Sequence, residues 1–383
     1  MRSVFTADRL WDGHTLIESP VIAAEDGRIV SIASQKDAAI PTGEVHAFPG
    51  LTLGPAFFDV HIHGSAGHDV MEATPEALLT IGKFLAKRGV GAYLATTVTA
   101  PMDATLRSLN GLAKLIEKAP EGALTWPIGI HLEGPFLSHA KRGVHPPDLL
   151  LAPQIDVFDR MFEAAGGHVR LMTLAPELPG AAELAAHATA RGVRVSVGHS
   201  NATAAETTPV LAAGATSATH TFNAMRPLDH REPGILGVVL TRDDLFAELI
   251  CDGIHTEPEL VRLWWKAKGA ERAILITDGM AAAGMPDGEY MLGGFPVQVA
   301  NGRAMANGVL AGSVLTLDRA LKNFIEFTSA TVENGLRLLS ANPAAMTGLS
   351  NRAGSITVGR PANLVVVDAA GGLVQSIHAG VLI

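Results

Sequence analysis

Six polar residues in this chain stand where apolar segments end, and their types are those that bind metal ions. The segments are GPAFFDVHIHG, WPIGIHLEGP, VRVSVGHS, ATSATHTFN and AILITDG, and they contain His61 and His63, Glu133, His199, His220 and Asp278. Imidazole nitrogens and carboxylate oxygens suit a divalent cation that activates water for hydrolysis. Unrelated core histidines have no reason to share this placement, so we interpret the set as one metal site.

The pair His61 and His63 is the most local part of this pattern. Side chains two residues apart in a strand point to the same face, so both imidazoles can bind one ion. One H-x-H pair is weak evidence by itself in a chain with 15 histidines. The repeated strand-end placement of the other candidates is what supports the metal interpretation.

The segments that would position these residues alternate strand-like runs with amphipathic helices, which predicts a parallel sheet. Eight strand runs are found, near Phe58, Tyr93, Ile130, Leu171, Val195, Ala218, Leu249 and Ile276. Helices are expected over 75–89, 101–119, 181–192, 202–214 and 257–269. Eight such units predict an α/β fold, a TIM-like (β/α)8 barrel whose active site lies at the carboxyl ends of the strands.

The two ends of the chain have a different texture. Residues 1–53 and 350–383 hold short β-like pieces separated by Gly, Asp and Pro turns, and we expect them to pair into one small β-sandwich domain. The barrel would then cover residues 54–349. Within it, residues 285–313 depart from the alternation and are interpreted as a β-hairpin insertion with a loop over the site.

Composition limits the classes of function. The chain has 383 residues, 48% of them hydrophobic and 17% charged, so a large buried core is expected. The net charge of −9 argues against nucleic acid and anionic membrane as partners. A single cysteine, Cys251, fits a reducing compartment and a core position. Asp8 and Asp12 interrupt the N-terminal segment, unlike a signal peptide, so we expect a cytoplasmic location.

Several segments together resemble a known family. HLEGPFLS, KRGVHPP, GHSNAT, THTFNAMRPLDHREPG, DGIHTEP and TDGM make the chain similar, from about residue 50 to its end, to the N-acetylglucosamine-6-phosphate deacetylases of the amidohydrolase superfamily. The most specific are HLEGPF, THTFNAM and HREPG, because barrel architecture alone does not require them. The resemblance implies a hydrolase that acts on a linear amide in amino sugar catabolism.

The resemblance also implies the metal ligands. Glu133, His199 and His220 match the ligands found throughout the family, whereas some members lack the H-x-H pair and use one ion. This chain keeps His61 and His63, so the resemblance leaves one or two ions per subunit open, the second bridged by Glu133. Mixed nitrogen and oxygen ligands suit Zn²⁺, Fe²⁺, Co²⁺ or Mn²⁺.

The remaining site residues follow from the same resemblance. Asp278 matches the catalytic aspartate, which serves first as base and then as acid. His145 matches the histidine that polarises the acetamide oxygen. The backbone N–H groups of Asn223 and Ala224 and the guanidinium of Arg231 would hold the sugar phosphate. His255 aligns with a histidine that contacts phosphate from a neighbouring subunit, which implies a homodimer with shared sites.

Three functions are consistent with these observations. The first is hydrolysis of the N-acetyl group of N-acetylglucosamine 6-phosphate to glucosamine 6-phosphate and acetate. The second keeps the chemistry but acts on N-acetylgalactosamine 6-phosphate or another N-acyl compound. The third is an inactive barrel that serves as a scaffold, because fold alone does not guarantee function. The intact set of candidate ligands favours an enzyme.

Overall fold

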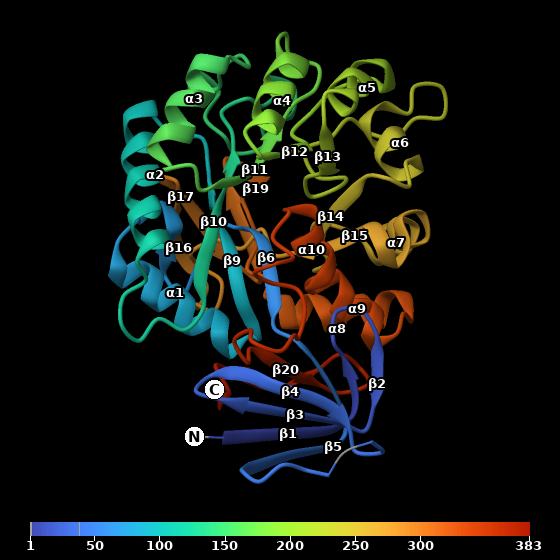
Figure 1. The fold of residues 1–383 in the computed structure, drawn as a ribbon. Helices are drawn as coiled ribbons and strands as arrows, with labels where there is room; N and C mark the ends of the chain where they lie inside the picture. The colour runs from blue at the N-terminus through green and yellow to red at the C-terminus, as the bar shows by residue number, and fades with distance from the viewer. Residues whose placement is uncertain (1, 38) are drawn as a thin grey trace.

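The computed structural model describes residues 2–37 and 39–383, and its centre is a barrel of eight parallel strands (Figure 1). In the order in which they pair, the strands are β15 (Ala273–Ile276), β14 (Phe246–Ile250), β13 (Ala215–Ala218), β12 (Arg194–Val197), β11 (Val169–Leu174), β10 (Trp126–Glu133), β9 (Val90–Thr97) and β6 (Phe57–Ile62). Each predicted strand position lies in one of them. The barrel prediction is therefore confirmed.

The barrel strands are apolar because both of their faces are covered. All residues of β6 and β15 are buried, one face toward the barrel interior and the other toward the surrounding helices. The helices are α1 (Pro75–Lys87), α2 (Met102–Glu117), α3 (Ile155–Ala164), α4 (Ala181–Ala190), α5 (Ala204–Ala212), α6 (Gly234–Thr241), α7 (Pro258–Arg272), α8 (Leu317–Thr328), α9 (Val332–Leu339) and α10 (Ala341–Met346). The five predicted helices are all present.

The barrel closes at its mouth, where the strands end. The N–H of Asp278 donates to the carbonyl of His61 at 2.9 Å, and the N–H of His63 donates to the carbonyl of Gly279 at 2.8 Å. These bonds join the segment after β15 to β6, the two edge strands of the parallel sheet. Closure therefore fixes the H-x-H pair directly beside Asp278.

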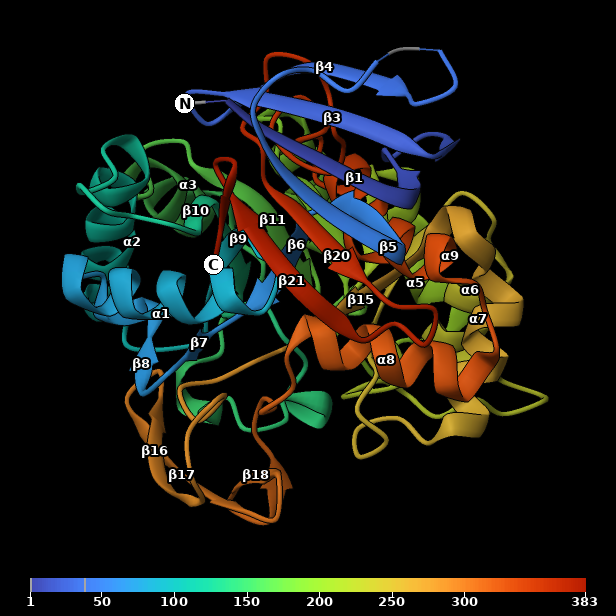
Figure 2. The same cartoon turned by 90° about the horizontal axis from the view of Figure 1, so that it is seen from below.

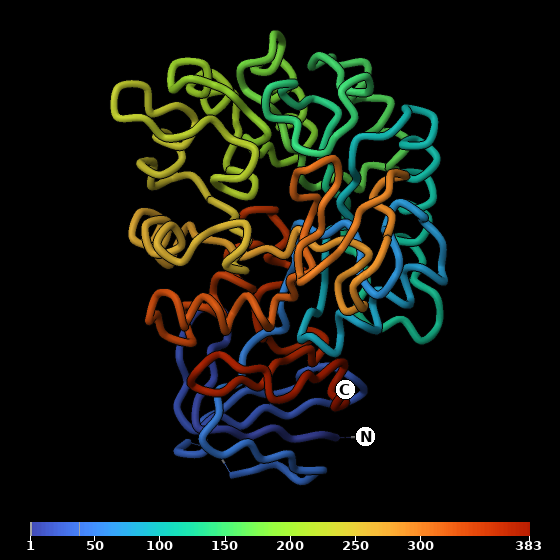
Figure 3. Tube along the Cα trace, turned by 180° about the vertical axis from the view of Figure 1, so that it is seen from behind, coloured from blue at the N-terminus to red at the C-terminus, as the bar shows by residue number. Residues whose placement is uncertain are grey.

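Strands from both chain ends form a second sheet below the barrel (Figures 1 and 2). It contains β1 (Arg2–Trp11), β2 (Leu16–Glu18), β3 (Pro20–Glu25), β4 (Arg28–Ser34), β5 (Glu44–Pro55), β20 (Leu364–Val367), β21 (Leu373–His378) and β22 (Val381–Leu382). We call it the terminal sheet. Both chain ends lie at this sheet (Figure 3).

The terminal sheet curls around an apolar cluster. Residues from early and late strands, including Phe5, Ile22 and Leu364, pack in that cluster. The N–H of Ile29 in β4 donates to the carbonyl of Arg360 at 2.9 Å, so the far edge of the sheet returns to the segment before β20. Because β5 continues to Pro55, it crosses the predicted boundary at residue 53. The division into 1–53 plus 350–383 and 54–349 stays a prediction.

The insertion has more strands than the hairpin that the sequence predicted. It is an antiparallel four-stranded sheet of β16 (Gly288–Leu292), β17 (Phe295–Ala300), β18 (Arg303–Ala306) and β19 (Val309–Leu310). Each link is a two-residue turn, Gly293-Gly294, Asn301-Gly302 and Asn307-Gly308, with both residues at positive φ. Such dipeptides match the twist of antiparallel pairs. Three turn signals stand in this segment, whereas the prediction of one hairpin rested on the break in the strand–helix alternation and not on the turns.

Among the described residues, no helix combines the length and the apolar character that crossing a lipid bilayer requires. The short pieces that remain are the pair β7 (Gly64–Ser65) and β8 (His68–Asp69) and the 3₁₀ helices Val70–Glu72, His139–Lys141 and Pro147–Leu149.

Candidate active site

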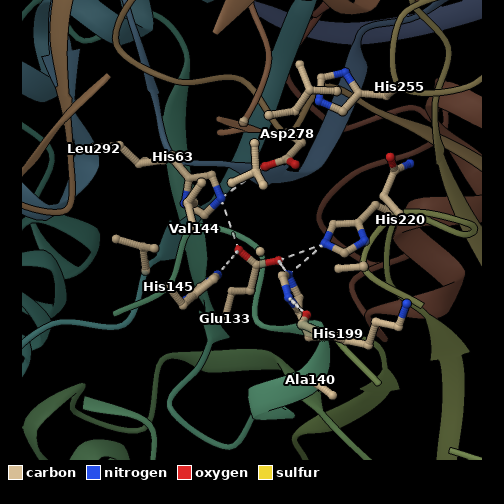
Figure 4. Close-up of a pocket in the computed structure, with 18 residues that line it drawn as sticks. His63, Glu133, Ala140, Val144, His145, His199, His220, His255, Asp278 and Leu292 are labelled. Atoms are coloured by element: carbon tan, nitrogen blue, oxygen red, sulfur yellow. Dashed lines mark hydrogen bonds and ion pairs between the residues drawn. The ribbon is translucent and has the colours of Figure 1, made fainter. Parts of the chain in front are cut away.

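The candidate ligands all lie at the mouth of the barrel. His61 is in β6 and His63 follows its end, and Glu133 is the last residue of β10. His199, His220 and Asp278 each come two residues after a strand, β12, β13 and β15 respectively. The structure thus brings together the residues that the sequence placed at strand ends, namely His61, His63, Glu133, His199, His220 and Asp278, and it adds the loop residue His145. Figure 4 shows how His63, Glu133, His145, His199, His220 and Asp278 converge.

The backbone at three of these positions is left-handed. His199, His220 and Asp278 have φ values of 45°, 26° and 50°. Non-glycine residues seldom adopt such angles, which cost about 1–3 kcal/mol each and cluster at functional sites. The strain turns each side chain out of its strand direction and into the mouth.

The Glu133 carboxylate is the centre of the cluster. Its Oε1 lies 3.1 Å from His220 Nε2, 3.2 Å from His199 Nε2 and 3.3 Å from His61 Nε2. Its Oε2 lies 3.2 Å from His63 Nε2 and 3.6 Å from His145 Nε2. Five imidazoles therefore converge on one buried carboxylate, from β6 and its end, from the segments after β12 and β13, and from the loop that holds His145.

Asp278 faces Glu133 across the H-x-H pair. Its Oδ1 lies 3.1 Å from His63 Nε2 and 3.5 Å from His61 Nε2. Two groups have ligand atoms that all lie within 4.8 Å of one another: His61, His63, Glu133 and Asp278, and then Glu133, His145 and His199. Glu133 belongs to both, so its position suits a carboxylate that bridges two ions.

The charges of the cluster fit a divalent cation. Glu133, Glu248 and Asp278 are buried, and their ion-pair partners are histidines rather than Lys or Arg. Buried carboxylates are costly without a compensating positive charge. In addition, His61 Nε2 and His220 Nδ1 are buried without a hydrogen-bond partner. A metal ion would supply both the positive charge and a partner for His61 Nε2, the nitrogen that faces the cluster.

Hydrogen bonds behind the histidines set their tautomers. His63 Nδ1 lies 3.1 Å from the carbonyl of Thr96, and His199 Nδ1 lies 2.9 Å from the carbonyl of Lys141. A carbonyl oxygen only accepts, so each Nδ1 carries a proton, and Nε2 is the nitrogen that a metal ion could bind. This is the usual arrangement of histidines that ligate a metal.

His145 is arranged differently. The backbone N–H of Thr99 donates to its Nδ1 at 3.3 Å, so the proton of the neutral ring is on Nε2. Burial lowers the pKa of His145 to about 4, which keeps the ring neutral at pH 7. Its Nε2–H therefore points toward Glu133 and the cavity as a hydrogen-bond donor, as polarising a carbonyl oxygen requires.

Asp278 is ionised in this surrounding. Burial raises its pKa, but the adjacent His61 and His63 outweigh burial and bring the pKa to about 2. Its side chain keeps 12% of its surface exposed, at the floor of the cavity. A charged carboxylate that meets both the cluster and the cavity can accept a proton there.

A cavity of roughly 300 Å³ opens above the cluster. Its walls come from the barrel mouth, from the segment 140–145 and from the insertion through Leu292, Val309 and Leu310. Asn223 and Ala224 also line it, as the phosphate prediction requires. A cavity of this size suits a small molecule such as a sugar phosphate.

Two residues predicted to bind phosphate, His255 and Arg231, differ in their position relative to the cavity. His255 lines the cavity of its own chain, where its Nδ1 lies 2.7 Å from Asp252 Oδ2, and its contact with the phosphate of a neighbouring subunit stays a prediction. The signal DGIHTEP cannot tell one subunit from another. Arg231 is exposed in the segment before α6 and is not a lining residue of the cavity.

Sequence reasoning missed two buried acids beside the cluster. Asp59 shares the face of His61 and His63, and its Oδ2 accepts a hydrogen bond from Thr277 at 2.6 Å. Burial raises the pKa of Asp59 to about 7. Glu248 in β14 contacts His61 Nδ1 at 3.3 Å. The signals were an alternating D-x-H-x-H and one charge inside the apolar run FAELIC.

Comparison with known proteins agrees with this geometry. The amidohydrolase family matches residues 52–379. N-acetylgalactosamine-6-phosphate deacetylase of Escherichia coli O157:H7 is 38% identical over 96% of this chain and 94% of its own length. N-acetylglucosamine-6-phosphate deacetylase of Lysinibacillus sphaericus is 39% identical over 93% and 91%.

A solved structure is similar over the whole chain. It is the D267A mutant of N-acetyl-D-glucosamine-6-phosphate deacetylase from Mycobacterium smegmatis in complex with N-acetyl-D-glucosamine-6-phosphate, with a TM-score of 0.92, 32% identity, and coverage of 100% of this chain and 99% of that one. Family match, relatives and fold agree with the cluster at the barrel mouth. The chain belongs to the amidohydrolase family.

Proposed function

We propose that this protein hydrolyses the N-acetyl group of N-acetylglucosamine 6-phosphate to glucosamine 6-phosphate and acetate. The observation that carries the proposal is the buried cluster around Glu133, which lies at the floor of a cavity together with the donor His145 and the base candidate Asp278. Relatives and a similar solved structure with this substrate in their names support the choice of sugar.

The metal site that we propose uses His61, His63, Glu133, His199 and His220, with one or two ions of Zn²⁺, Fe²⁺, Co²⁺ or Mn²⁺. A divalent ion at such a site lowers the pKa of water and polarises a carbonyl group. The residues of the chain provide the rest: they orient the amide, exclude bulk water and move protons.

Proton transfer is assigned to Asp278. An amide resists hydrolysis because its carbonyl is a weak electrophile and its amine a poor leaving group. Asp278 would take a proton from the attacking water and then deliver it to the departing sugar nitrogen, so one carboxylate serves as base and then as acid. Its place between the cluster and the cavity supports both steps.

The acetamide oxygen is assigned to His145. Its Nε2–H donates into the cavity while Thr99 holds the other side of the ring, Oγ1 lying 2.8 Å from Nδ1. A fixed neutral donor of this kind stabilises the negative charge that develops on the oxygen as water adds.

Phosphate binding is assigned to the backbone N–H groups of Asn223 and Ala224 and to Arg231. Asn223 and Ala224 line the cavity, whereas Arg231 is exposed outside its lining. We also propose a homodimer with shared active sites, in which His255 contributes to phosphate binding across the subunit boundary. The single cysteine, buried and unpaired, supports a reducing, cytoplasmic location.

N-acetylgalactosamine 6-phosphate is the second candidate substrate. The relative with that substrate in its name is 38% identical to this chain, close to the 39% of a glucosamine relative. The two sugars differ in the configuration of one hydroxyl, which the phosphate and acetamide contacts do not report. Sequence identity alone therefore does not decide which of the two epimeric sugars is the substrate.

The test is turnover of both phosphorylated sugars and of unphosphorylated N-acetylglucosamine, before and after chelation and metal restoration. We expect metal-dependent acetate release with the highest kcat/KM on N-acetylglucosamine 6-phosphate. Preference for the galactosamine epimer would move the proposal to the second candidate. No turnover of any of the three by metal-loaded protein would favour another N-acyl substrate or an inactive scaffold.

A further inference from the structure

A carboxylate with no part in the proposed reaction lies directly behind the metal-binding cluster. Glu248 is in the middle of β14, and its side chain has no exposed surface. The ion-pair partner of this carboxylate is His61, and its Oε1 is buried without a hydrogen-bond partner. Burying a carboxylate costs stability unless its contacts compensate. Glu248 therefore calls for an explanation in terms of what it contacts.

Glu248 contacts two of the candidate ligands. Its Oε2 lies 3.3 Å from His61 Nδ1, and the same oxygen accepts a hydrogen bond from the backbone N–H of His220 at 3.4 Å. Its backbone carbonyl accepts from the N–H of Thr221 at 2.8 Å. One residue thus holds His61 in β6 and the segment that carries His220 after β13.

The contact with His61 fixes which nitrogen faces the cluster. A carboxylate beside Nδ1 favours a proton at Nδ1, so Nε2, which lies 3.3 Å from Glu133 and 3.5 Å from Asp278, is the nitrogen left for a metal ion. Nε2 has no hydrogen-bond partner there. Two carboxylate oxygens this close favour a positive charge at Nε2, which a proton or a metal ion can supply.

The contact with His220 acts on the backbone. His220 is held at a φ of 26°, an angle that persists only where surrounding contacts enforce it. The bonds from the N–H groups of His220 and Thr221 to Glu248 are two such contacts. They anchor the turn that aims His220 Nε2 at Glu133.

We propose that Glu248 is a positioning residue of the metal centre, which orients His61 through its Nδ1 and holds the strained backbone at His220, so that metal affinity depends on it. The inference rests on the metal-dependent part of the proposed function and not on the identity of the sugar. Removing such an outer partner typically lowers metal affinity about 10–100-fold.

The test uses Co²⁺ alone as the probe. Glu248→Gln keeps the size of the side chain but removes its charge, and Glu333→Gln makes the same change on α9, where Glu333 pairs with Arg9 at 2.9 Å. Affinity for Co²⁺ is measured by competition with a chelator, together with the visible absorption spectrum and the thermal midpoint of the metal-free protein.

We expect Glu248→Gln to bind Co²⁺ about 10–100-fold more weakly than the wild type, with a changed spectrum, and Glu333→Gln to match the wild type. A residue with a structural role only would lower the thermal midpoint and leave Co²⁺ affinity and spectrum unchanged. That result would overturn the inference.

If Glu248→Gln does not fold, Glu248→Asp is tested by the same criterion, because it keeps the charge and withdraws the carboxylate by one methylene. These measurements need no substrate. If Glu248→Gln binds Co²⁺ more weakly but the wild type does not hydrolyse the sugar phosphate, the inference holds and the proposed function fails. If the wild type hydrolyses the sugar phosphate but the Glu248 variants bind Co²⁺ as tightly as the wild type, the proposed function holds and the inference fails.

Discussion

The mouth of the barrel and the terminal sheet use strands in opposite ways. In the terminal sheet, apolar side chains such as Phe5, Ile22 and Leu364 close an apolar cluster, and the buried polar residues of its described strands, Thr6, Thr52 and Ser376, are uncharged. At the barrel mouth, apolar strands end in buried histidines and carboxylates. In the terminal sheet, the strand side chains therefore contribute to stability. At the barrel mouth, the candidate catalytic groups lie at the ends of the strands.

Backbone strain separates the two regions as well. In the terminal sheet, left-handed residues such as Asp26 and Gly27 make the tight turn between β3 and β4. At the mouth, His199, His220 and Asp278 are left-handed although no hairpin requires it. Their strain is explained by the direction it gives to the side chains. Substitutions at the mouth should therefore change chemistry more than stability, and those in the terminal sheet should do the opposite.

The largest effect is expected at a ligand of the mouth. His199→Ala removes a nitrogen 3.2 Å from Glu133 Oε1, so the variant should lose both tightly bound metal and turnover. Metal content by elemental analysis and acetate release are measured on the same sample. A variant that keeps a full complement of metal would remove His199 from the ligand set.

Next in size is the loss of the proposed base. Asp278→Asn should lower kcat by about 10²–10⁴-fold, because an amide cannot take and return the proton. Metal content should stay near that of the wild type, since the imidazoles and Glu133 remain. Wild-type kcat in Asp278→Asn would show that another group moves the proton.

In the terminal sheet, a substitution in the apolar cluster should change stability more than turnover. Leu364 is fully buried in its apolar cluster, so Leu364→Ala should lower the free energy of unfolding by about 2–5 kcal/mol. Turnover at 25 °C should be unchanged, because no mouth residue is touched.

Val381→Ala is the control in the same sheet, since Val381 is 63% exposed and its loss should change stability by less than about 0.5 kcal/mol. Equal losses of stability in Leu364→Ala and Val381→Ala, followed by chemical denaturation, would contradict the assignment of stability to this cluster.

The smallest effect is expected from a buried nucleophile that is not at the mouth. Burial raises the pKa of the Cys251 thiol, so the thiolate that reacts with disulfide reagents is scarce in the folded protein. Native protein should react with such a reagent only as fast as it unfolds, and unfolded protein should react at once. Rapid modification of the native protein would show that the segment after β14 opens.

Much of the barrel could be predicted because its signals are local. Apolar runs predicted the strands. A residue of ligand type at the end of a run, such as Glu133 or Asp278, indicated the mouth of the barrel. Glu248 could not be found in this way, because one acid within an apolar run has no period and no terminus to mark it. Its meaning depends on His61, which is distant in sequence.

Predictions that involve a second chain had no local signal at all. The motifs around Arg231 and His255 indicate phosphate binding, but the side of a subunit boundary on which each lies depends on how the barrel and its loops are arranged in space. The structure places His255 in the cavity and leaves Arg231 outside its lining.

The most direct measurement is the initial rate of acetate release from N-acetylglucosamine 6-phosphate while a divalent metal is titrated into metal-free protein. The rate should be negligible without metal, rise in proportion to bound metal and level off at one or two ions per subunit. Full turnover by the metal-free protein, or none at saturation, would contradict the account of the barrel mouth as a metal-dependent deacetylase site.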